Sequence, residues 1–242
     1  MIIVKVDKDT WLKRKKSFWH RMLEDLEIGY LDKDLLPLLI VLNIEQGIHT
    51  MSSCSGRIVA SDSRSPWSRE SDSTVIFKKH TPVKPEEILE LYKIPVYRKI
   101  WLNVTGPIIH LSAMDLAIAI KILRIARLSG YKHSGIISLS RDKGVVLELT
   151  TGVYMSTPLR TRSKDIVKPE EVPELVELVN NILYEGKKRL AKLYMELKKA
   201  LPWRPDEEIV EYIEKHGIRI HERNPIEVFE ELSSNLRDNH NS

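Results

Sequence analysis

The segment Thr50-Met51-Ser52-Ser53-Cys54-Ser55-Gly56-Arg57-Ile58-Val59-Ala60-Ser61 contains two short runs with the composition of β-strands, at 50–53 and 57–61. Small polar residues and a glycine separate the runs, and such residues are typical of turns. We therefore predict two strands that pair as a hairpin around Cys54-Ser55-Gly56. This segment also marks the point at which the helical pattern before it gives way to a strand pattern.

On both sides of this segment, the spacing of apolar residues predicts the remaining elements. A helix is expected at 9–27, and a second one begins near Asp32 or Asp34, with Pro37 in its first turn, and runs to about 46. Residues 62–73 are expected to form a loop. Further helices are predicted at 85–92, 112–129, 170–200, 206–216 and 225–236, and further strands at 75–77, 100–104, 108–111, 136–140, 145–149 and 154–159. Apolar residues on nearly every side of 112–129 predict a buried helix.

This order lacks the regular strand–helix alternation of a doubly wound parallel sheet. It predicts an α+β fold with a mixed sheet core and flanking helices. A strand–turn–strand unit followed by a helix occurs once before Pro95 and once after it, which suggests an internal duplication. We expect one domain over residues 1–201 and a helical C-terminal extension over 202–242.

Composition limits the class of protein. The chain has 242 residues, of which 42% are hydrophobic and 30% charged, as in ordinary globular proteins. No apolar run approaches the roughly 20 residues of a membrane-spanning helix, and the N-terminus lacks the pattern of a secretory signal, so we expect a cytoplasmic protein without a membrane segment. The single cysteine agrees with this location. The net charge of +4 favours a polyanionic partner only weakly.

Several common functional motifs are missing. Neither a Walker A sequence nor a Rossmann glycine fingerprint is present, which argues against nucleotidases and dehydrogenases. No histidines or carboxylates stand at metal-ligand spacing, so no metal is predicted.

The turn at Ser52–Arg57 is the strongest candidate site in the residues themselves. Serine hydroxyls and N–H groups beside a glycine can form an anion-binding concavity, and an arginine can hold a carboxylate or phosphate through two parallel bonds. The alternative is a plain turn with Arg57 in solvent and Cys54 buried as a small apolar residue.

The run Ser52-Ser53-Cys54-Ser55-Gly56-Arg57-Ile58 resembles the signature of the tRNA wybutosine-synthesizing protein 3 family, in its archaeal type. The resemblance extends over about Trp11–Leu201 and includes further matching segments in order. They are Leu31-Asp32-Lys33-Asp34, Leu42-Asn43, His80 with Val83, Pro107-Ile108-Ile109-His110, Gly130-Tyr131-Lys132-His133-Ser134-Gly135-Ile136, Pro158-Leu159, Asn180, Lys187, Arg189 and Tyr194.

The resemblance implies a function that periodicity and composition do not. Members transfer a methyl group from S-adenosylmethionine to a ring nitrogen of the tricyclic base beside the anticodon of tRNA(Phe). The resemblance also implies a methyltransferase fold unlike the Rossmann type. The expected partners are therefore S-adenosylmethionine and tRNA(Phe), and no DNA.

Roles follow for individual residues. The cofactor is expected near Ser52, Ser53, Cys54, Ser55, Gly56 and Arg57, with Ser134 and Gly135 lending a hydroxyl and an N–H group. His80 and His110 are candidates for the base or for hydrogen bonds to the modified nucleoside, because histidine changes protonation near neutral pH. Asp34 is a third candidate, although a helix cap explains it as well. Backbone-bonded histidines and a plain turn at Ser134 are the alternatives.

Basic residues are candidates for contacts with tRNA phosphates, and Trp67 or Tyr131 for stacking on an unstacked base. Solvated helix faces are the ordinary explanation for such charges. The predicted RNA-binding residues are Lys121, Arg124, Lys132, Lys187 and Arg189.

Four positions depart from the family pattern: Lys79, Thr105, Thr150 and Ser156. A non-catalytic RNA-binding paralogue is therefore a rival hypothesis. A phosphoester enzyme that uses the Ser-Cys-Ser-Gly-Arg turn is a weaker one, because no histidine or lysine adjoins the turn in sequence.

Overall fold

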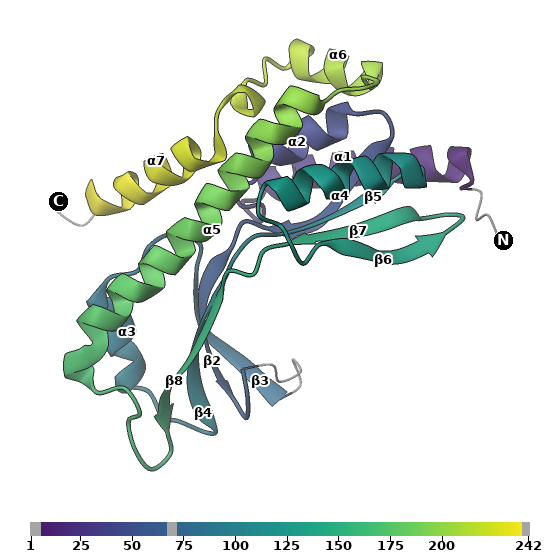
Figure 1. Cartoon of the computed structure of the whole chain (residues 1–242). Helices are drawn as coiled ribbons and strands as arrows, with labels where there is room; N and C mark the ends of the chain where they lie inside the picture. Colours follow the sequence, from purple (N-terminus) through teal and green to yellow (C-terminus); the bar gives the residue numbers. More distant parts are fainter. Residues whose placement is uncertain (1–5, 67–71, 239–242) are drawn as a thin grey trace. The chain divides into compact units, whose positions relative to one another are not determined.

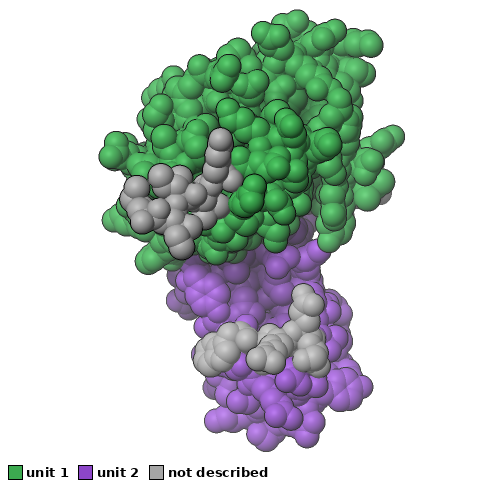
Figure 2. Space-filling model, turned by 90° about the vertical axis from the view of Figure 1, so that its right-hand side faces the viewer, with its two compact units in different colours: residues 1–55, 107–152, 187–242 green, residues 56–106, 153–186 purple. Residues whose placement is uncertain are grey.

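The computed structural model describes residues 6–66 and 72–238, with side chains described up to residue 235. The chain divides into two compact units (Figures 1 and 2). Unit 1 comprises Met1–Ser55, Pro107–Gly152 and Lys187–Ser242, and unit 2 comprises Gly56–Gly106 and Val153–Gly186. Because the chain passes between the units repeatedly, neither unit is one continuous stretch of sequence. In the described residues, no helix is both long and apolar enough to cross a bilayer.

Unit 1 contains a four-stranded antiparallel sheet in the order β1-β5-β7-β6. Its strands are β1 (Ile48–Cys54), β5 (Ile108–Ala113), β6 (Gly135–Ser140) and β7 (Gly144–Thr150). Its helical elements are α1 (Lys8–Glu27), α2 (Leu36–Ile44), α4 (Leu116–Leu128), α6 (Glu207–Lys215), η4 (Ile220–Glu222), α7 (Pro225–Asp238) and the part of α5 (Val172–Ala200) from Lys187 on. The helices α1, α2 and α4 lie over one face of this sheet (Figure 1).

The core of unit 1 forms between that sheet face and the helices. Leu36–Asn43 of α2 is buried throughout, which explains why its sequence is apolar on every side. Ile109 and Leu111 of β5, which are completely buried, alternate with the partly exposed His110. This alternation is what a strand with one covered face requires.

Unit 2 contains a second four-stranded antiparallel sheet, in the order β3-β2-β4-β8. Its elements are β2 (Arg57–Ser63), β3 (Ser73–Lys79), α3 (Pro85–Leu89), η2 (Glu90–Tyr92), β4 (Lys99–Thr105), β8 (Tyr154–Thr161), η3 (Pro169–Glu171) and the part of α5 up to Gly186. Ile58, Ile100 and Leu102 of the two central strands are completely buried, as is Val179 of α5.

The α+β class is confirmed, since both sheets are built from antiparallel pairs with helices beside them. The predicted hairpin at Cys54-Ser55-Gly56 is wrong. β1 pairs with β5 and β2 pairs with β3 and β4, so the two runs belong to different sheets. The same separation occurs between β4 and β5. Strand periodicity identifies a strand and its covered face but not its partner, and Gly56, at φ +95°, redirects the chain.

The predicted buried helix at 112–129 is wrong in two respects. Ser112 and Ala113 belong to β5, and α4 begins at Leu116 behind Asp115, whose carboxylate accepts a hydrogen bond from the Ile118 N–H group. One face of α4 is exposed, with Leu128 75% accessible. By contrast, the turn predicted before Gly144 is confirmed, because β6 and β7 pair across it.

Candidate functional site

In unit 1, the predicted site residues collect at one end of the sheet. The register aligns Cys54 at the end of β1 with Ile108 at the start of β5 and Thr150 at the end of β7. Gly135 begins β6 opposite Glu148 of β7. Antiparallel pairing therefore brings the segments 52–54, 108–110 and 134–135 together, although they lie far apart in sequence.

His110 connects three strands of this sheet. Its Nδ1 lies 2.9 Å from the carbonyl oxygen of Ser52 and its Nε2 lies 2.9 Å from Oε2 of Glu148. Its backbone N–H group donates to Oγ of Ser53. Both ring nitrogens of His110 therefore have a partner within the sheet.

Two aspartates hold the predicted cofactor turn, one directly and one through a lysine. Asp32 accepts the Ser55 N–H group at 2.9 Å. Oγ of Ser55 accepts a hydrogen bond from Nζ of Lys187 at 2.6 Å, and the same ammonium donates to Oδ2 of Asp34 at 2.6 Å. Ser55, Asp34 and Lys187 are all buried. Asp32 thus holds the backbone of the turn, and the buried ion pair holds its Ser55 side chain.

The predicted helix cap at Asp34 is wrong, because α2 is preceded by Leu35 without a side-chain cap. The Asp34 carboxylate is instead paired with Lys187, and the predicted phosphate contact of Lys187 is wrong. Lys187 is only 1% exposed and cannot lie on a phosphate-binding surface. The ring of Phe229, from α7, covers it with its centroid 4.9 Å from the ammonium.

Ser134 has a structural role. Its hydroxyl donates to the carbonyl oxygen of Tyr131 at 2.8 Å and accepts the Thr150 N–H group at 3.1 Å, and the side chain is buried. Its only proton is thus already donated within the chain, and a ligand contact of this hydroxyl stays a prediction. Gly135 differs: a Cβ placed there would meet no atom within 4 Å, so the backbone at this position is open to close approach.

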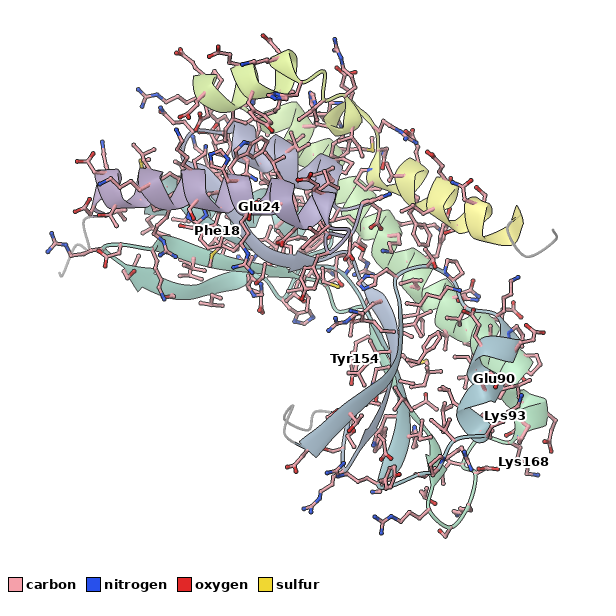
Figure 3. All side chains as sticks on the ribbon, turned by 180° about the vertical axis from the view of Figure 1, so that it is seen from behind. Phe18, Glu24, Glu90, Lys93, Tyr154 and Lys168 are labelled. Carbon is pink, nitrogen blue, oxygen red and sulfur yellow. The ribbon has the colours of Figure 1, made fainter. Side chains whose placement is uncertain are left out.

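In unit 2, the remaining predicted residues also collect at one end of the sheet. Arg57 begins β2 and lies opposite Thr105, the last residue of β4, which in turn lies opposite Tyr154. Tyr154, labelled in Figure 3, begins β8. Ile58 pairs with Lys79, so His80 follows β3 at this same end. Arg57 is exposed and His80 is partly buried.

The segment after His80 is fixed to α5. The Asn180 side chain accepts the Val83 N–H group and donates to the Val83 carbonyl oxygen, each at 2.9 Å. Two hydrogen bonds to the same backbone residue fix the position of Val83 along α5. His80 is thereby positioned from its C-terminal side.

The four departures from the family pattern have local contacts. Lys79 forms an ion pair with Glu87 at 2.8 Å. Ser156 donates to Oδ1 of Asn103 at 2.6 Å. Thr150 bonds to Ser134 through its N–H group, and Thr105 pairs within the sheet between Arg57 and Tyr154. These substitutions are accommodated in the sheets without distortion of their register.

The other predicted RNA contacts lie in unit 1. Arg124 and Lys132 are exposed, Lys121 packs its ammonium 4.7 Å from the Trp203 ring centroid, and Arg189 donates to the Gly130 carbonyl oxygen. Tyr131 is completely buried, so it cannot stack on a base as predicted. Trp67, the other predicted stacking residue, lies outside the described residues.

Comparison with known proteins adds the family. The model described as Methyltransferase TYW3 matches residues 13–199, which is most of the chain. The chain belongs to the TYW3 methyltransferase family. This membership confirms the resemblance inferred from the Ser52–Ile58 run and its accompanying segments, and it makes the chain a methyltransferase by family.

Relatives of the TYW3 family carry a specific name. One from Saccharolobus solfataricus is 37% identical over 181 residues, covering 74% of this chain and 86% of that protein, and is named tRNA(Phe) 7-((3-amino-3-carboxypropyl)-4-demethylwyosine(37)-N(4))-methyltransferase. One from Aeropyrum pernix, with the same name, is 35% identical over 166 residues, covering 69% of this chain and 87% of that protein.

Solved structures of similar chains support the TYW3 fold. The PH1069 protein from Pyrococcus horikoshii aligns with a TM-score of 0.73 and 28% identity, covering 78% of this chain and 97% of that one. A hypothetical protein from Aeropyrum pernix aligns with a TM-score of 0.64 and 32% identity, covering 70% of this chain and 99% of that one. Every strand pair described in this TYW3 chain is antiparallel, whereas the sheet of a Rossmann fold is parallel.

Sequence reasoning missed Glu148, the partner of His110. A signal for it existed, because Glu148 is the single charged residue in the otherwise apolar run Val145–Leu149 of β7. Asp32 was expected only near the start of a helix, although it is the residue that holds the Ser55 N–H group.

Proposed function

We propose that this chain methylates N4 of 7-(3-amino-3-carboxypropyl)-4-demethylwyosine at position 37 of tRNA(Phe), with S-adenosylmethionine as the methyl donor. The observation that carries the proposal is the family match over residues 13–199, together with relatives of that name at up to 37% identity. When bound, the cofactor supplies an electrophilic methyl group on a positively charged sulfur. The residues of the chain must then bind the cofactor and the nucleoside, orient the two, and remove the proton from N4.

The groups at the sheet end of unit 1 suit such a cofactor. Glu148 is partly exposed, and among the described contacts only its Oε2 is used, by His110. Its other oxygen can accept a hydrogen bond from a ribose hydroxyl or an ammonium. The exposed Ser52 hydroxyl and the open backbone at Gly135 offer further polar contacts beside it. A carboxylate close to a bound cation also stabilises the cation electrostatically.

We assign His110 to positioning. By holding the Ser52 carbonyl and the Glu148 carboxylate at 2.9 Å each, it fixes both the predicted cofactor segment and the acceptor beside it. A group held from both nitrogens loses little entropy when a ligand binds, so the site is preorganised. His110 therefore contributes to cofactor affinity and does not take part in proton transfer.

We assign removal of the N4 proton to another residue. Asp34 is paired with Lys187 inside unit 1, and each ring nitrogen of His110 lies 2.9 Å from an oxygen of the chain. His80, at the end of β3 and held by the Asn180–Val83 contact, is the remaining predicted candidate. Histidine is suited to this step because it titrates near neutral pH.

Methyl incorporation tests the proposal. The purified chain is incubated with labelled S-adenosylmethionine and tRNA(Phe) that carries the demethylwyosine derivative. Label is expected in that tRNA, and not in tRNA(Phe) that has an unmodified guanosine at position 37. Tight tRNA binding without label would instead support an RNA-binding protein that has lost the activity.

A further inference from the structure

A basic concavity lies at the other end of the unit 2 sheet, away from Arg57 and His80. Its volume is about 950 Å³, and its lining residues are Arg64, Thr74, Tyr97, Arg98, Lys99 and Arg162. The position follows from the topology: β2 and β8 end here while β3 and β4 begin here, with Ser63 opposite Ser73 and Lys99 opposite Thr161. At roughly 3.3 Å per strand residue, Arg64 is about 23 Å from Arg57 along β2.

The charge of this concavity has one sign. Four of the six lining residues are cationic, and the described lining includes no carboxylate. Within the described parts of the chain, none of the four forms an ion pair with an acidic side chain. Four adjacent cations repel one another, so the arrangement gains free energy when an anion enters.

The segment that carries two of these cations is firmly held. Asp62, which is 4% exposed, accepts the Tyr97 N–H group at 2.6 Å and the Arg98 N–H group at 2.7 Å, one on each carboxylate oxygen. Arg162 donates from Nε to the Tyr97 carbonyl oxygen. The Asp62 carboxylate thus holds the backbone that carries Arg98 and Lys99, and among the described residues it forms no ion pair with the cationic side chains.

An aromatic ring completes the surface. Tyr97 is 66% exposed, although its backbone is bonded at both the N–H group and the carbonyl. An exposed aromatic side chain on a fixed backbone beside several cations is the arrangement with which proteins bind single-stranded nucleic acid, the ring stacking on a base and the cations contacting phosphates. A small inorganic anion would leave most of the concavity and the ring without a contact.

We propose that this concavity binds the phosphodiester backbone of the tRNA substrate, with one unpaired base stacked on Tyr97. The proposal rests on the proposed function for the identity of the RNA. It assigns the contact to unit 2, whereas the basic residues predicted from sequence lie in unit 1. Within unit 2, it separates the RNA-anchoring residues from Arg57 by the length of β2.

The test compares two double variants that remove the same charge from unit 2. Arg64→Gln with Lys99→Gln changes the concavity. Lys93→Gln with Lys168→Gln is the control, since both lysines are exposed and lie beside α3 and the start of α5 (Figure 3). Affinity for tRNA(Phe) is measured by fluorescence anisotropy over a range of salt concentrations. Each lost phosphate contact lowers the slope of log affinity against log salt by about 0.7 to 0.9.

We expect the concavity variant to lose at least about tenfold in tRNA affinity and roughly 1.5 in slope, and the control to lose much less. Tyr97→Ala should weaken binding by about tenfold while Tyr97→Phe retains it, because the ring and not the hydroxyl stacks. S-adenosylmethionine binding should be unchanged in all of them. Equal losses in the concavity and control variants would overturn the proposal, and so would wild-type affinity in the concavity variant.

Two further outcomes distinguish this proposal from the proposed function. If the wild-type chain binds tRNA through the concavity but transfers no methyl group, the concavity stands and the proposed function fails. If the chain methylates tRNA and the concavity variants bind it normally, the function stands and the concavity is not the anchor. Binding of poly-glutamate in place of tRNA, abolished by the same variant, would assign the concavity to an acidic protein and contradict the RNA proposal.

Discussion

The ammonium of Lys187 lies 2.6 Å from Oδ2 of Asp34, and both side chains are at most 3% exposed. Removal of one partner leaves the other charge buried without compensation, which typically costs about 3–5 kcal/mol. We expect Lys187→Met to lower the free energy of unfolding by an amount of this order, measured by denaturant titration. Asp34→Leu together with Lys187→Met should recover most of the loss. If Lys187→Met alone is as stable as the wild type, the pair does not stabilise unit 1.

His49 should make unit 1 sensitive to acid. It is completely buried, with its ring stacked on Phe18 at 5.0 Å and tilted against Trp11 at 5.1 Å. Figure 3 labels Phe18 on α1. Burial lowers the pKa of His49 from 6.5 to about 4, and the nearby Arg14 and Lys15 charges add to this effect.

The direction of the pH dependence follows from that lowered pKa. Between pH 6.5 and about 4 the unfolded chain binds a proton at His49 and the folded chain does not, so stability is full above pH 6.5 and is lost as the pH falls. The loss is at most about 3 kcal/mol. His49→Phe should lose about 2 kcal/mol less than the wild type between pH 7 and 4.5 in denaturant titrations. Equal losses would show that His49 is not excluded from protonation.

His110 and Glu148 should act together on cofactor affinity. Because His110 positions the Ser52 carbonyl and Glu148, we expect His110→Gln and Glu148→Gln each to raise the KM for S-adenosylmethionine about tenfold, with a small change in kcat. The double variant should be little worse than either one. A general base typically contributes about a hundredfold or more to the rate. A loss of that size in kcat, with a lost limb in the pH profile, would make His110 the base instead.

Arg57 offers a contrast between binding and stability. It is exposed at the start of β2, so Arg57→Ala should change the free energy of unfolding by less than about 0.5 kcal/mol. Cofactor or phosphate affinity should nevertheless fall, and Arg57→Lys should restore it only in part because an ammonium lacks the planar fork. Unchanged dissociation constants for both ligands, measured by calorimetry, would remove Arg57 from the site.

Gly144 should be irreplaceable. Its φ is +72°, and a Cβ there would lie 2.6 Å from the Ala113 carbonyl oxygen and 2.8 Å from Nε1 of Trp11. Gly144→Ala should therefore cost about 2–5 kcal/mol through strain and overpacking. Gly217 is the matched control, since its φ is +60° but a Cβ would meet nothing within 4 Å. A similar, small cost at both positions, measured by thermal unfolding, would contradict this account of the β6–β7 turn.

The sequence allowed prediction of features that depend on local pattern. The helix at 9–27 corresponds to α1, the turn before Gly144 joins β6 and β7, and the signature at Ser52–Ile58 led to the right family. These follow from side-chain periodicity, turn chemistry and a linear motif, all of which are encoded within a few residues.

Features that depend on distant partners were not predictable in the same way. β1 and β2 have the alternation of strands, but only the tertiary fold assigns them to different sheets. In the sequence, Lys187 resembles a surface lysine in a basic cluster. Its partners Asp34 and Phe229 are distant in sequence, so the residues around Lys187 do not reveal that it is buried. The concavity of unit 2 likewise gathers residues from four strand ends, and none of its members forms a linear motif.

The atom that receives the methyl group decides whether the chain is this N4-methyltransferase. After reaction of the chain with S-adenosylmethionine and tRNA(Phe) that carries 7-(3-amino-3-carboxypropyl)-4-demethylwyosine at position 37, the tRNA is digested and its nucleosides are identified by mass spectrometry and chromatography. We expect a single added methyl group at N4 of that nucleoside, with other nucleosides unchanged. No added methyl group, or one placed on a different nucleoside or a different atom, would contradict it.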